Sequence, residues 1–278
     1  MTINIGGQLM DFRVPRVMGI LNSTPDSFYT GSRHFGDVDL KTAVERLIAE
    51  GADIIDVGGC STRPGSVAPS QKEEIERIDR ALSIVRQLAP KAVVSLDTWR
   101  SEVAYHAITK WGIAIINDIS GGRFDNNLFD VVAETHVVYV LTHSRSIPAE
   151  MMRHAGYEDV TVDVIKELSE TLWILRSKNI NDIIIDPGFG FAKTPQQSLA
   201  LLNELEEFCR LGLPVLAGLS RKSLIWKTLG TTPEESLAGT VALNAVAIEK
   251  GADILRVHDV REAKETITLL SKMRNYND

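Results

Sequence analysis

The chain has 278 residues, of which 44% are apolar and 24% charged, and its 30 basic and 37 acidic side chains give a formal net charge of −7. A chain of this length buries roughly three quarters of the surface that its unfolded form exposes, so it needs no disulfide or metal to hold a fold together. The acidic balance argues against a general binding surface for nucleic acid or anionic lipid. Any anion that the protein binds must therefore find a local cluster of basic groups.

The two cysteines, Cys60 and Cys209, lie far apart and have no C-x-x-C motif or histidine-rich neighbour. Their spacing excludes a disulfide scaffold, a structural zinc site and a thioredoxin-type motif. No apolar run approaches the roughly 18 residues of a membrane helix, and the start of the chain lacks the basic and apolar stretches of a signal peptide. We therefore expect a cytoplasmic protein that neither spans a membrane nor is secreted.

Short β-branched runs alternate with longer amphipathic runs along the sequence, and no linker rich in Gly, Ser or Pro interrupts them. The short runs are almost wholly apolar, which is typical of parallel strands that helices cover on both faces. Strands are predicted over residues 17–21, 54–58, 93–97, 114–117, 137–141, 183–186, 215–218 and 254–257.

The longer runs between these strands have apolar residues spaced by three or four, as in Ile75, Ile78, Leu82 and Val85, and predict crossover helices. The simplest topology for such repeated β/α units is a (β/α)8 TIM barrel, with residues 1–278 as one domain. A doubly wound open sheet is the alternative, but no G-x-G-x-x-G motif follows the first strand.

Polar residues stand just after each predicted strand. Taken singly, each has a structural explanation, because Asp or Ser before a helix is usually an N-cap and Asn or Asp often stabilises a turn. In a (β/α)8 barrel, however, these positions converge on the face that carries the active site. In chain order they are Asn22, residues 60–63, Asp97, Asn117, Asp118, His143, Asp186, residues 220–222, Arg256 and His258. The complete set favours a binding site over separate structural roles.

The basic members of this set indicate an anionic ligand. Arg63, Lys222, Arg256 and His258, with the helix N-termini that follow the strands, supply the donors that a phosphate ester requires. The sequence has no metal-binding cluster of His and Cys, so any metal would be a hard cation that shares phosphate oxygens. Mg²⁺ is the natural candidate.

The acidic and amide members indicate a second feature of the ligand. Asp97, Asn117 and Asp186 supply acceptors deep in the barrel mouth, where a carboxylate is costly unless it meets donors. A flat heterocycle with a ring N–H and an amino group would provide such donors.

Five segments resemble the motifs of the dihydropteroate synthase family, in the order and spacing of that family. They are residues 18–28, 55–65, 186–191, 219–223 and 254–260. The resemblance covers about residues 14–262, and five motifs together are highly specific. It implies a pterin-binding (β/α)8 barrel that joins 6-hydroxymethyl-7,8-dihydropterin pyrophosphate to 4-aminobenzoate, with release of 7,8-dihydropteroate and pyrophosphate. It further implies folate biosynthesis, competition by sulfonamides and a homodimer.

The resemblance also implies how the pterin is bound. Asp97, Asn117 and Asp186 would hold the polar edge of the pterin, while Lys222 would contact its ring polar atoms. Arg256 would stack on the ring and reach the pyrophosphate.

For the pyrophosphate, the resemblance implies Asn22 and His258 with Mg²⁺, and Asn22 would be the metal ligand. No residue needs to be a nucleophile, because the arylamine attacks the pterin methylene once the C–O bond has loosened. The catalytic residues would be Arg63, Lys222 and Arg256, which stabilise charge and exclude water.

For the aminobenzoate, the resemblance implies a loop with Thr62, Arg63 and Pro64 that closes over the substrate. Phe191 and Ser220 would complete this pocket, together with Lys222.

The sequence departs from the family pattern in both loops and strands. Cys60 stands where many relatives have Glu, and Ser23 replaces the usual Val. Thr30 replaces a frequent Asp, and Thr142 and Ser144 flank a histidine where methionines are common. These changes leave the primary pterin and pyrophosphate residues intact.

Two other functions fit parts of the pattern. One is the methyltetrahydrofolate-binding domain of a corrinoid methyltransferase, which shares the acceptors for the pterin edge but has no need of the segments around Arg63 and Lys222. The other is a non-catalytic paralogue that binds pterin phosphates, which the loop departures permit.

Overall fold

Eight parallel strands form one sheet in the part of the chain that the structure, a computed structural model, describes: residues 1–23, 36–60, 68–145 and 155–274. The strands are β3 (Arg16–Asn22), β4 (Ile54–Gly58), β5 (Val93–Asp97), β6 (Ile115–Asp118), β7 (Val138–Thr142), β8 (Ile183–Asp186), β9 (Leu216–Ala217) and β10 (Ile254–Val257). Each of the eight predicted strands is present, and their ends differ from the prediction by at most one residue.

The order of the strands makes the sheet a barrel. The hydrogen-bonded order is β8-β7-β6-β5-β4-β3-β10-β9, so the first strand of the barrel lies beside the last one. Ile185 of β8 bridges Val215, next to β9, and its N–H donates to the carbonyl of Pro214 at 2.9 Å. These contacts bring the two ends of the sheet together. The expected (β/α)8 barrel is confirmed, and the doubly wound alternative is excluded.

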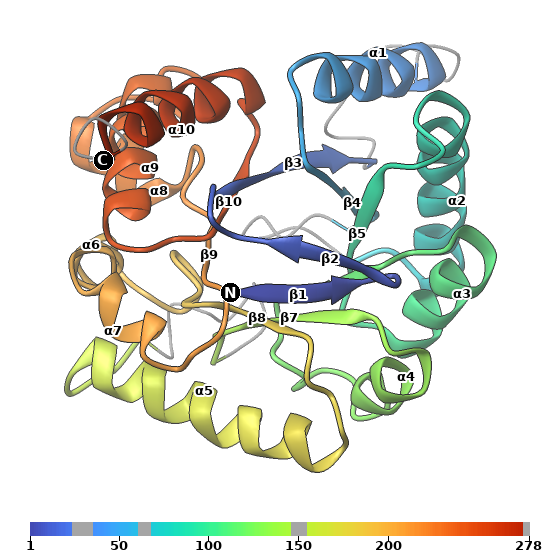
Figure 1. The fold of residues 1–278 in the computed structure, drawn as a ribbon, viewed down its shortest axis with the longest axis horizontal. Helices are drawn as coiled ribbons and strands as arrows, with labels where there is room; N and C mark the ends of the chain where they lie inside the picture. Colours follow the sequence, from blue (N-terminus) through green and yellow to red (C-terminus); the bar gives the residue numbers. More distant parts are fainter. Residues whose placement is uncertain (24–35, 61–67, 146–154, 275–278) are drawn as a thin grey trace.

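Helices surround the barrel (Figure 1). They are α1 (Gly36–Ala49), α2 (Gln71–Leu88), α3 (Ser101–Trp111), α4 (Leu128–Thr135), α5 (Val160–Ser177), α6 (Pro195–Asn203), α7 (Leu205–Cys209), α8 (Ser223–Leu229), α9 (Leu237–Glu249) and α10 (Val260–Arg274). Capping boxes start two of them, with Ser70 and Glu73 at α2 and Thr194 and Gln197 at α6. Such reciprocal side-chain bonds satisfy N–H groups that the first helical turn leaves unpaired. None of the described helices is long and apolar enough to span a membrane.

Two apolar cores hold the fold together. The larger one lies between the barrel and its helices and includes Val57, Ile78 and Leu82. The smaller one fills the barrel near the amino ends of its strands and includes Met18 and Ile254. This division follows from the alternation of side chains along each strand, which sends successive residues to opposite faces of the sheet.

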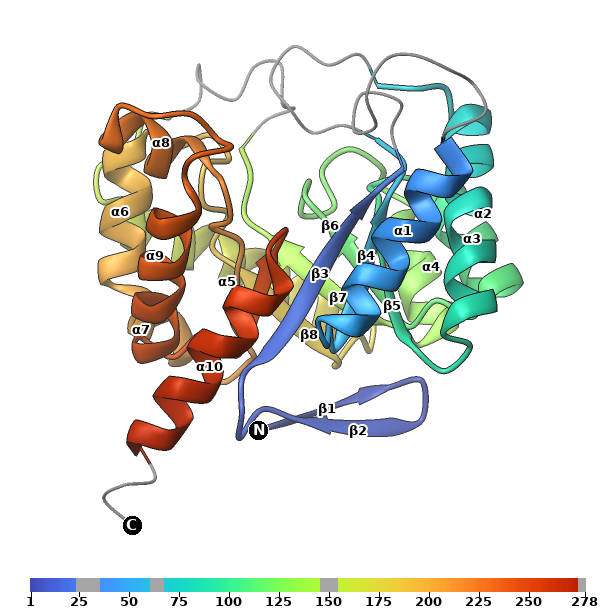
Figure 2. The ribbon, with the colours of Figure 1, turned by 90° about the horizontal axis from the view of Figure 1, so that it is seen from above.

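An N-terminal hairpin closes one end of the barrel, a feature that the strand analysis did not predict. β1 (Thr2–Ile5) and β2 (Gln8–Asp11) pair in antiparallel register around Gly6 and Gly7, whose φ angles are +57° and +86°. Ile3 and Ile5 are buried against the smaller core. Figure 2 shows the hairpin at the end opposite the strand arrowheads. The carboxyl ends of the strands therefore form the open face.

Candidate active site

The carboxyl ends of four neighbouring strands align their polar residues in one row. In the parallel register, Asn22 of β3 is opposite Gly58 of β4, Gly58 is opposite Asp97 of β5, and Asp97 is opposite Asn117 of β6. Gly58 has no side chain, and a Cβ atom built there would lie 3.7 Å from Asn22 Oδ1 and 3.8 Å from Asp97 Oδ2. The glycine therefore leaves a space into which both oxygens project.

Arg256 reaches across this row from β10. Its Nε donates to Asp56 Oδ2 at 2.7 Å and its Nη2 donates to Asp97 Oδ2 at 2.6 Å. Asn117 Nδ2 also donates to Asp56 Oδ2, at 3.1 Å. Asp56, Asp97 and Asn117 are all buried, so the guanidinium neutralises carboxylates in a region of low water access.

The buried charged side chains of this group change one another's pKa values. Burial raises the pKa of Asp97 to about 7; the positive charge of Arg256 opposes the rise, and Asp56 adds to it. Burial lowers the pKa of Arg256, but the carboxylates of Asp56 and Asp97 outweigh it and hold the pKa above its usual value. Arg256 thus keeps its charge, whereas the charge of Asp97 depends on pH near neutrality.

A second acid and base pair lies beside Arg256. A Cβ atom built at Gly218 would lie 3.6 Å from Lys222 Nζ, 3.8 Å from Asp186 Oδ2 and 4.0 Å from Arg256 Cβ, so these three side chains surround the same glycine. Asp186 is buried, and its Oδ1 accepts a hydrogen bond from the N–H of Gly188 at 2.7 Å. Burial raises the pKa of Asp186, against the opposing charge of Lys222.

Lys222 is fixed by the segment that follows β8. Its Nζ donates to the carbonyl of Phe189 at 2.6 Å and lies 4.6 Å from the centre of the Phe191 ring. Burial lowers the pKa of Lys222 to about 8, although the carboxylate of Asp186 favours its charged form. Phe191 thus lies beside the ammonium group, as expected for a residue of the same site.

Ser220 and His258 join the loops that follow β9 and β10. The N–H of His258 donates to Ser220 Oγ at 3.2 Å, and the next residues in each loop, Arg221 and Asp259, form an ion pair at 2.8 Å. Arg46 of α1 donates to the carbonyl of His258 at 3.4 Å. These contacts hold the last two loops of the barrel against each other, next to Arg256.

The structure places nine of the predicted site residues at the carboxyl ends of the barrel strands or in the loops that follow them. These are Asn22, Asp97, Asn117, Asp186, Phe191, Ser220, Lys222, Arg256 and His258. Thr62, Arg63 and Pro64 lie outside the described residues, as does the departure at Thr30.

Asp118 belongs to the predicted set but has a structural role. Its carboxylate accepts hydrogen bonds from the N–H groups of Ser120 and Gly122, each at 2.7 Å, and from the hydroxyl of Tyr139 at 2.6 Å. It follows Asn117 directly in β6, so the two side chains point to opposite faces of the sheet.

The residues that depart from the family pattern leave the row of polar residues at the strand ends in place. Ser23 Oγ donates to the carbonyl of Gly58 at 2.9 Å, and burial raises the pKa of the Cys60 thiol to about 11. A thiol with such a pKa is a poor nucleophile near neutral pH, which supports a packing role for Cys60. Thr142 and Ser144 are buried at the end of β7.

Asp56 was missed in the sequence analysis. It stands inside an apolar strand rather than after it, and the isolated carboxylate in that run was the available signal. Its Oδ1 is buried and has no hydrogen-bond partner among the described residues. The site therefore has acceptor capacity beyond the three predicted groups.

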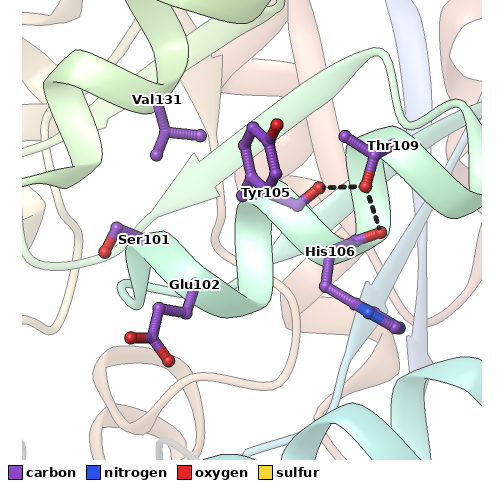
Figure 3. A pocket seen from close by; sticks show the side chains of 6 residues that line it. All are labelled: Ser101, Glu102, Tyr105, His106, Thr109 and Val131. Atoms are coloured by element: carbon purple, nitrogen blue, oxygen red, sulfur yellow. Dashed lines mark hydrogen bonds between the residues drawn. The ribbon is translucent and has the colours of Figure 1, made fainter.

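A surface hollow on α3 is separate from this site. Tyr105, His106 and Thr109 line it, and the Thr109 hydroxyl donates to the carbonyls of Tyr105 and His106 at 2.8 and 3.2 Å (Figure 3). His106 Nε2 also lies 2.8 Å from Asp79 Oδ1. The hollow is lined by residues of α3 and by Val131 of α4, and none of them belongs to the predicted site.

Asn22 offers an oxygen ligand that suits a hard cation. Its Oδ1 lies 3.7 Å from a Cβ atom built at Gly58, and oxygen is the ligand that Mg²⁺ prefers. In the described parts of the chain, no group of three His, Cys, Asp or Glu side chains could hold a metal ion by itself. A cation here would take further ligands from a bound phosphate group.

Comparison with known proteins agrees with this geometry. Residues 18–258 match the family described as pterin binding enzyme. This range contains every residue of the site, and the chain belongs to the pterin-binding enzyme family.

Relatives within the family narrow the class. The dihydropteroate synthase of Bacillus subtilis is 40% identical over 262 residues, which cover 93% of this chain and 88% of the relative. The Xanthomonas albilineans dihydropteroate synthase with 4-aminobenzoic acid has a TM-score of 0.90 and 36% identity, over 98% of each chain. The Yersinia pestis dihydropteroate synthase in a sulfonamide drug complex has a TM-score of 0.90 and 33% identity, over 99% of this chain and 100% of the other. Sequence and structure thus assign the chain, within its family, to the dihydropteroate synthases, transferases of folate biosynthesis.

Proposed function

We propose that this barrel joins 6-hydroxymethyl-7,8-dihydropterin pyrophosphate to 4-aminobenzoate at the site around Arg256. One observation carries the proposal: Arg256 is held between Asp56 and Asp97, in a buried group with Asn117. Hydrogen-bond acceptors that suit a heterocycle thus lie beside a permanent cation that suits an anion. The relatives, which are named for this reaction, support the choice of substrates.

The pterin would bind deepest, by its polar edge. Asp97, Asn117 and Asp186 offer acceptors for its ring N–H and amino groups, and Lys222 offers a donor to its ring. Buried acceptors that meet ligand donors avoid the desolvation cost of unpaired polar groups. Arg256 would leave Asp97 to the pterin and stack on the ring.

The pyrophosphate would lie nearer the open face. Arg256 and His258 are positioned on β10 and just after it, and Asn22 would hold Mg²⁺. Bound Mg²⁺ would neutralise negative charge on the leaving group. The positive end of the helix that follows His258 adds N–H donors for the same anion.

The aminobenzoate would bind between Phe191, Ser220 and the segment with Thr62, Arg63 and Pro64. In the reaction, the bond between the pterin methylene carbon and the pyrophosphate oxygen breaks and takes its electron pair to the oxygen. The amine nitrogen forms the new bond to that carbon and then loses a proton to solvent. Arg63 would help to exclude water, which competes for the methylene carbon.

The charge that develops on the pterin defines the catalytic roles. Asp97 and Asp186 can stabilise a pterin that becomes cationic as the pyrophosphate leaves, because both carboxylates lie in a region of low dielectric. Arg256 stabilises the leaving anion, and Lys222 orients the ring. Arg63, Lys222 and Arg256 are therefore the proposed catalytic residues.

Two copies of the chain would form a homodimer through α9 and α10. These helices pack side by side (Figure 1), and they expose Val246, Leu269 and Met273 by 40%, 67% and 67%. Large apolar side chains exposed on two adjacent helices favour a protein partner. Light scattering of the protein and of a Leu269→Glu variant would test this, with a monomeric wild-type chain contradicting it.

We also propose that residues 1–278 act as one pterin-binding domain and that the protein works in the cytoplasm. Packing of the hairpin against the barrel supports the first statement. The content of only two cysteines and the bacterial relatives support the second.

A single assay tests the activity. The purified protein is incubated with pterin pyrophosphate and Mg²⁺, with and without 4-aminobenzoate, and pyrophosphate release is measured. We expect release that depends on the arylamine. Binding of the pterin without any release would instead indicate a non-catalytic paralogue.

A further inference from the structure

A buried lysine outside the proposed catalytic set lies directly behind the site. Lys193 is 3% exposed, and its Nζ lies 2.9 Å from His143 Nδ1, 3.0 Å from the carbonyl of Gly188 and 3.0 Å from the carbonyl of Phe191. A lysine ammonium has three N–H donors and no acceptor. The three shortest contacts therefore give the charged lysine one acceptor for each hydrogen. Burial lowers the pKa of Lys193 to about 7, although the carboxylate of Asp186 favours the charged form.

The partner on the other side of the ring fixes the protonation of His143. The carboxylate of Glu167 can only accept, so the ring nitrogen Nε2, which lies 3.1 Å from Glu167 Oε2, carries the proton. A neutral ring has one proton, so His143 Nδ1 is unprotonated and accepts from Lys193. Burial lowers the pKa of His143 to about 4, which keeps the ring neutral near pH 7. Arg145 and Arg123 hold the carboxylate of Glu167 at 2.8 and 3.1 Å, so Glu167 is oriented as an acceptor.

The carbonyls that Lys193 holds belong to the segment that fixes Lys222. Gly188 and Phe191 flank Phe189, whose carbonyl accepts the hydrogen bond from Lys222 Nζ at 2.6 Å. The Phe191 ring lies 4.6 Å from the same ammonium group. Lys193 therefore anchors this short segment on both sides of the group that positions Lys222.

We propose that Lys193 is a positioning residue for Lys222 and that it acts only while neutral His143 accepts its hydrogen bond and donates to Glu167. The line of contacts runs from the outer helix α5, which carries Glu167, through His143 and Lys193 to the pterin pocket. The inference rests on the proposed function in one respect, since Lys222 is taken to contact the pterin ring.

The tautomer of His143 tests the arrangement without any substrate. Nitrogen-15 NMR of the free protein, labelled at histidine and assigned with a His143→Gln variant, distinguishes a protonated ring nitrogen from an unprotonated one. We expect His143 to be neutral, with its proton on Nε2. A proton on Nδ1, or a doubly protonated ring at pH 7, would overturn the proposal and would leave the proposed reaction untouched.

Substitution tests the effect on the site. Lys193→Met keeps an unbranched side chain that is one atom shorter and removes all three donors, so we expect the Kd for pterin pyrophosphate to rise about tenfold or more. The matched control is Lys110→Met, which removes a lysine paired with Asp79 on the outside of the barrel and should leave the Kd unchanged. An unchanged Kd in Lys193→Met would contradict the proposal. A wild-type protein that binds no pterin pyrophosphate would instead contradict the proposed function.

A second pair of variants separates positioning from general stability. His143→Gln offers an amide oxygen to Lys193 and an amide N–H to Glu167, whereas His143→Leu offers neither. We expect near wild-type affinity and kcat/KM in His143→Gln, and a loss in His143→Leu that matches Lys193→Met. The comparison of these two His143 variants still tests the proposal if Lys193→Met fails to fold. Equal losses in His143→Gln and His143→Leu would overturn the role of the hydrogen bonds.

Discussion

Arg256 forms an ion pair with Asp97 in the structure, with 2.6 Å between Nη2 of the arginine and Oδ2 of the aspartate. The two residues come from β10 and β5, 159 positions apart in the sequence. A pterin that binds Asp97 must replace this contact with its own N–H donors. Asp56 still holds Arg256 through Nε at 2.7 Å, so the arginine keeps one carboxylate partner when it turns toward the pyrophosphate.

Loss of an acceptor from the pterin pocket should weaken pterin binding strongly and leave the fold intact. Asn117→Ala and Asp186→Ala each leave donors of the ligand unpaired in a buried site, which costs about 1–3 kcal/mol per group, or roughly tenfold or more in affinity. Titration calorimetry with the pterin pyrophosphate measures this. Asn203→Ala, at the exposed end of α6, is the control that should bind normally. Unchanged affinity in both pocket variants would remove the assignment of the pocket.

The pH dependence of pterin binding should have two limbs. The N–H donors of the pterin favour the ionised form of Asp97, whose pKa is about 7, so affinity should rise as the pH rises through that value. Lys222, whose pKa is about 8, loses its charge above that pH, and affinity should then fall. We expect a maximum between about pH 7 and pH 8.

An Asp97→Asn variant separates the two limbs. The amide has no carboxyl group to ionise, so the rise through about pH 7 should vanish and the fall above about pH 8 should persist. Calorimetry with the pterin lacking its pyrophosphate avoids the titration of the phosphate groups. The assignment fails if the variant keeps the acidic limb of the wild type.

The hairpin at the closed end should contribute stability and no catalysis. Ile5→Ala removes a buried side chain over the smaller core, and such changes cost about 2–5 kcal/mol of unfolding free energy. Leu9→Ala on the same hairpin alters a side chain that is 77% exposed and should change the free energy by less than about 0.5 kcal/mol. Urea unfolding measures both, and pterin affinity should be normal in each. Equal destabilisation would show that the hairpin does not cap the core.

The barrel was predictable because its strands carry their signal locally. Apolar runs such as 54–58 and 183–186 are short, bounded by polar residues and separated by helical spacing, and all of these features are visible in sequence. The hairpin was not predicted, since its strands have four residues each and pack in one apolar cluster with Ile184 and Ile254, which are distant in the sequence. Tertiary contacts of this kind produce no hydrophobic periodicity in the local sequence.

The sequence predicted which residues stand at the ends of the strands, but not which side chains form contacts with one another. Asp97 and Asn117 follow from the rule that strand ends converge at one face of a barrel. Asp56 escaped that rule because it lies within its strand, and its partner Arg256 is 200 residues away. Lys193 escaped it because it stands seven residues after the end of β8 and reaches back to the site.

Binding of the two substrates should be ordered, because the same cations serve the leaving group and the closure of the site. If Arg256, His258 and Mg²⁺ act on the departing pyrophosphate, the free anion should occupy their site and favour the arrangement of the segment with Thr62, Arg63 and Pro64 that contacts aminobenzoate. The aminobenzoate should then bind appreciably only when pyrophosphate or the pterin pyrophosphate is present.

The coupling between the two ligands is the quantity to measure, and we expect a free energy of about 1–3 kcal/mol, which corresponds to roughly 5- to 150-fold in affinity. Titration of 4-aminobenzoate with and without Mg²⁺ and pyrophosphate gives it directly. Arg256→Ala should remove both the affinity for the anion and the coupling, since no other described cation bridges Asp56 and Asp97. Cys60→Ala is the control, because a buried thiol whose pKa is about 11 takes no part in anion binding, and both quantities should stay unchanged. Equal affinity for aminobenzoate in the two titrations would mean that its pocket exists before the anion binds, and the ordered mechanism would then be wrong.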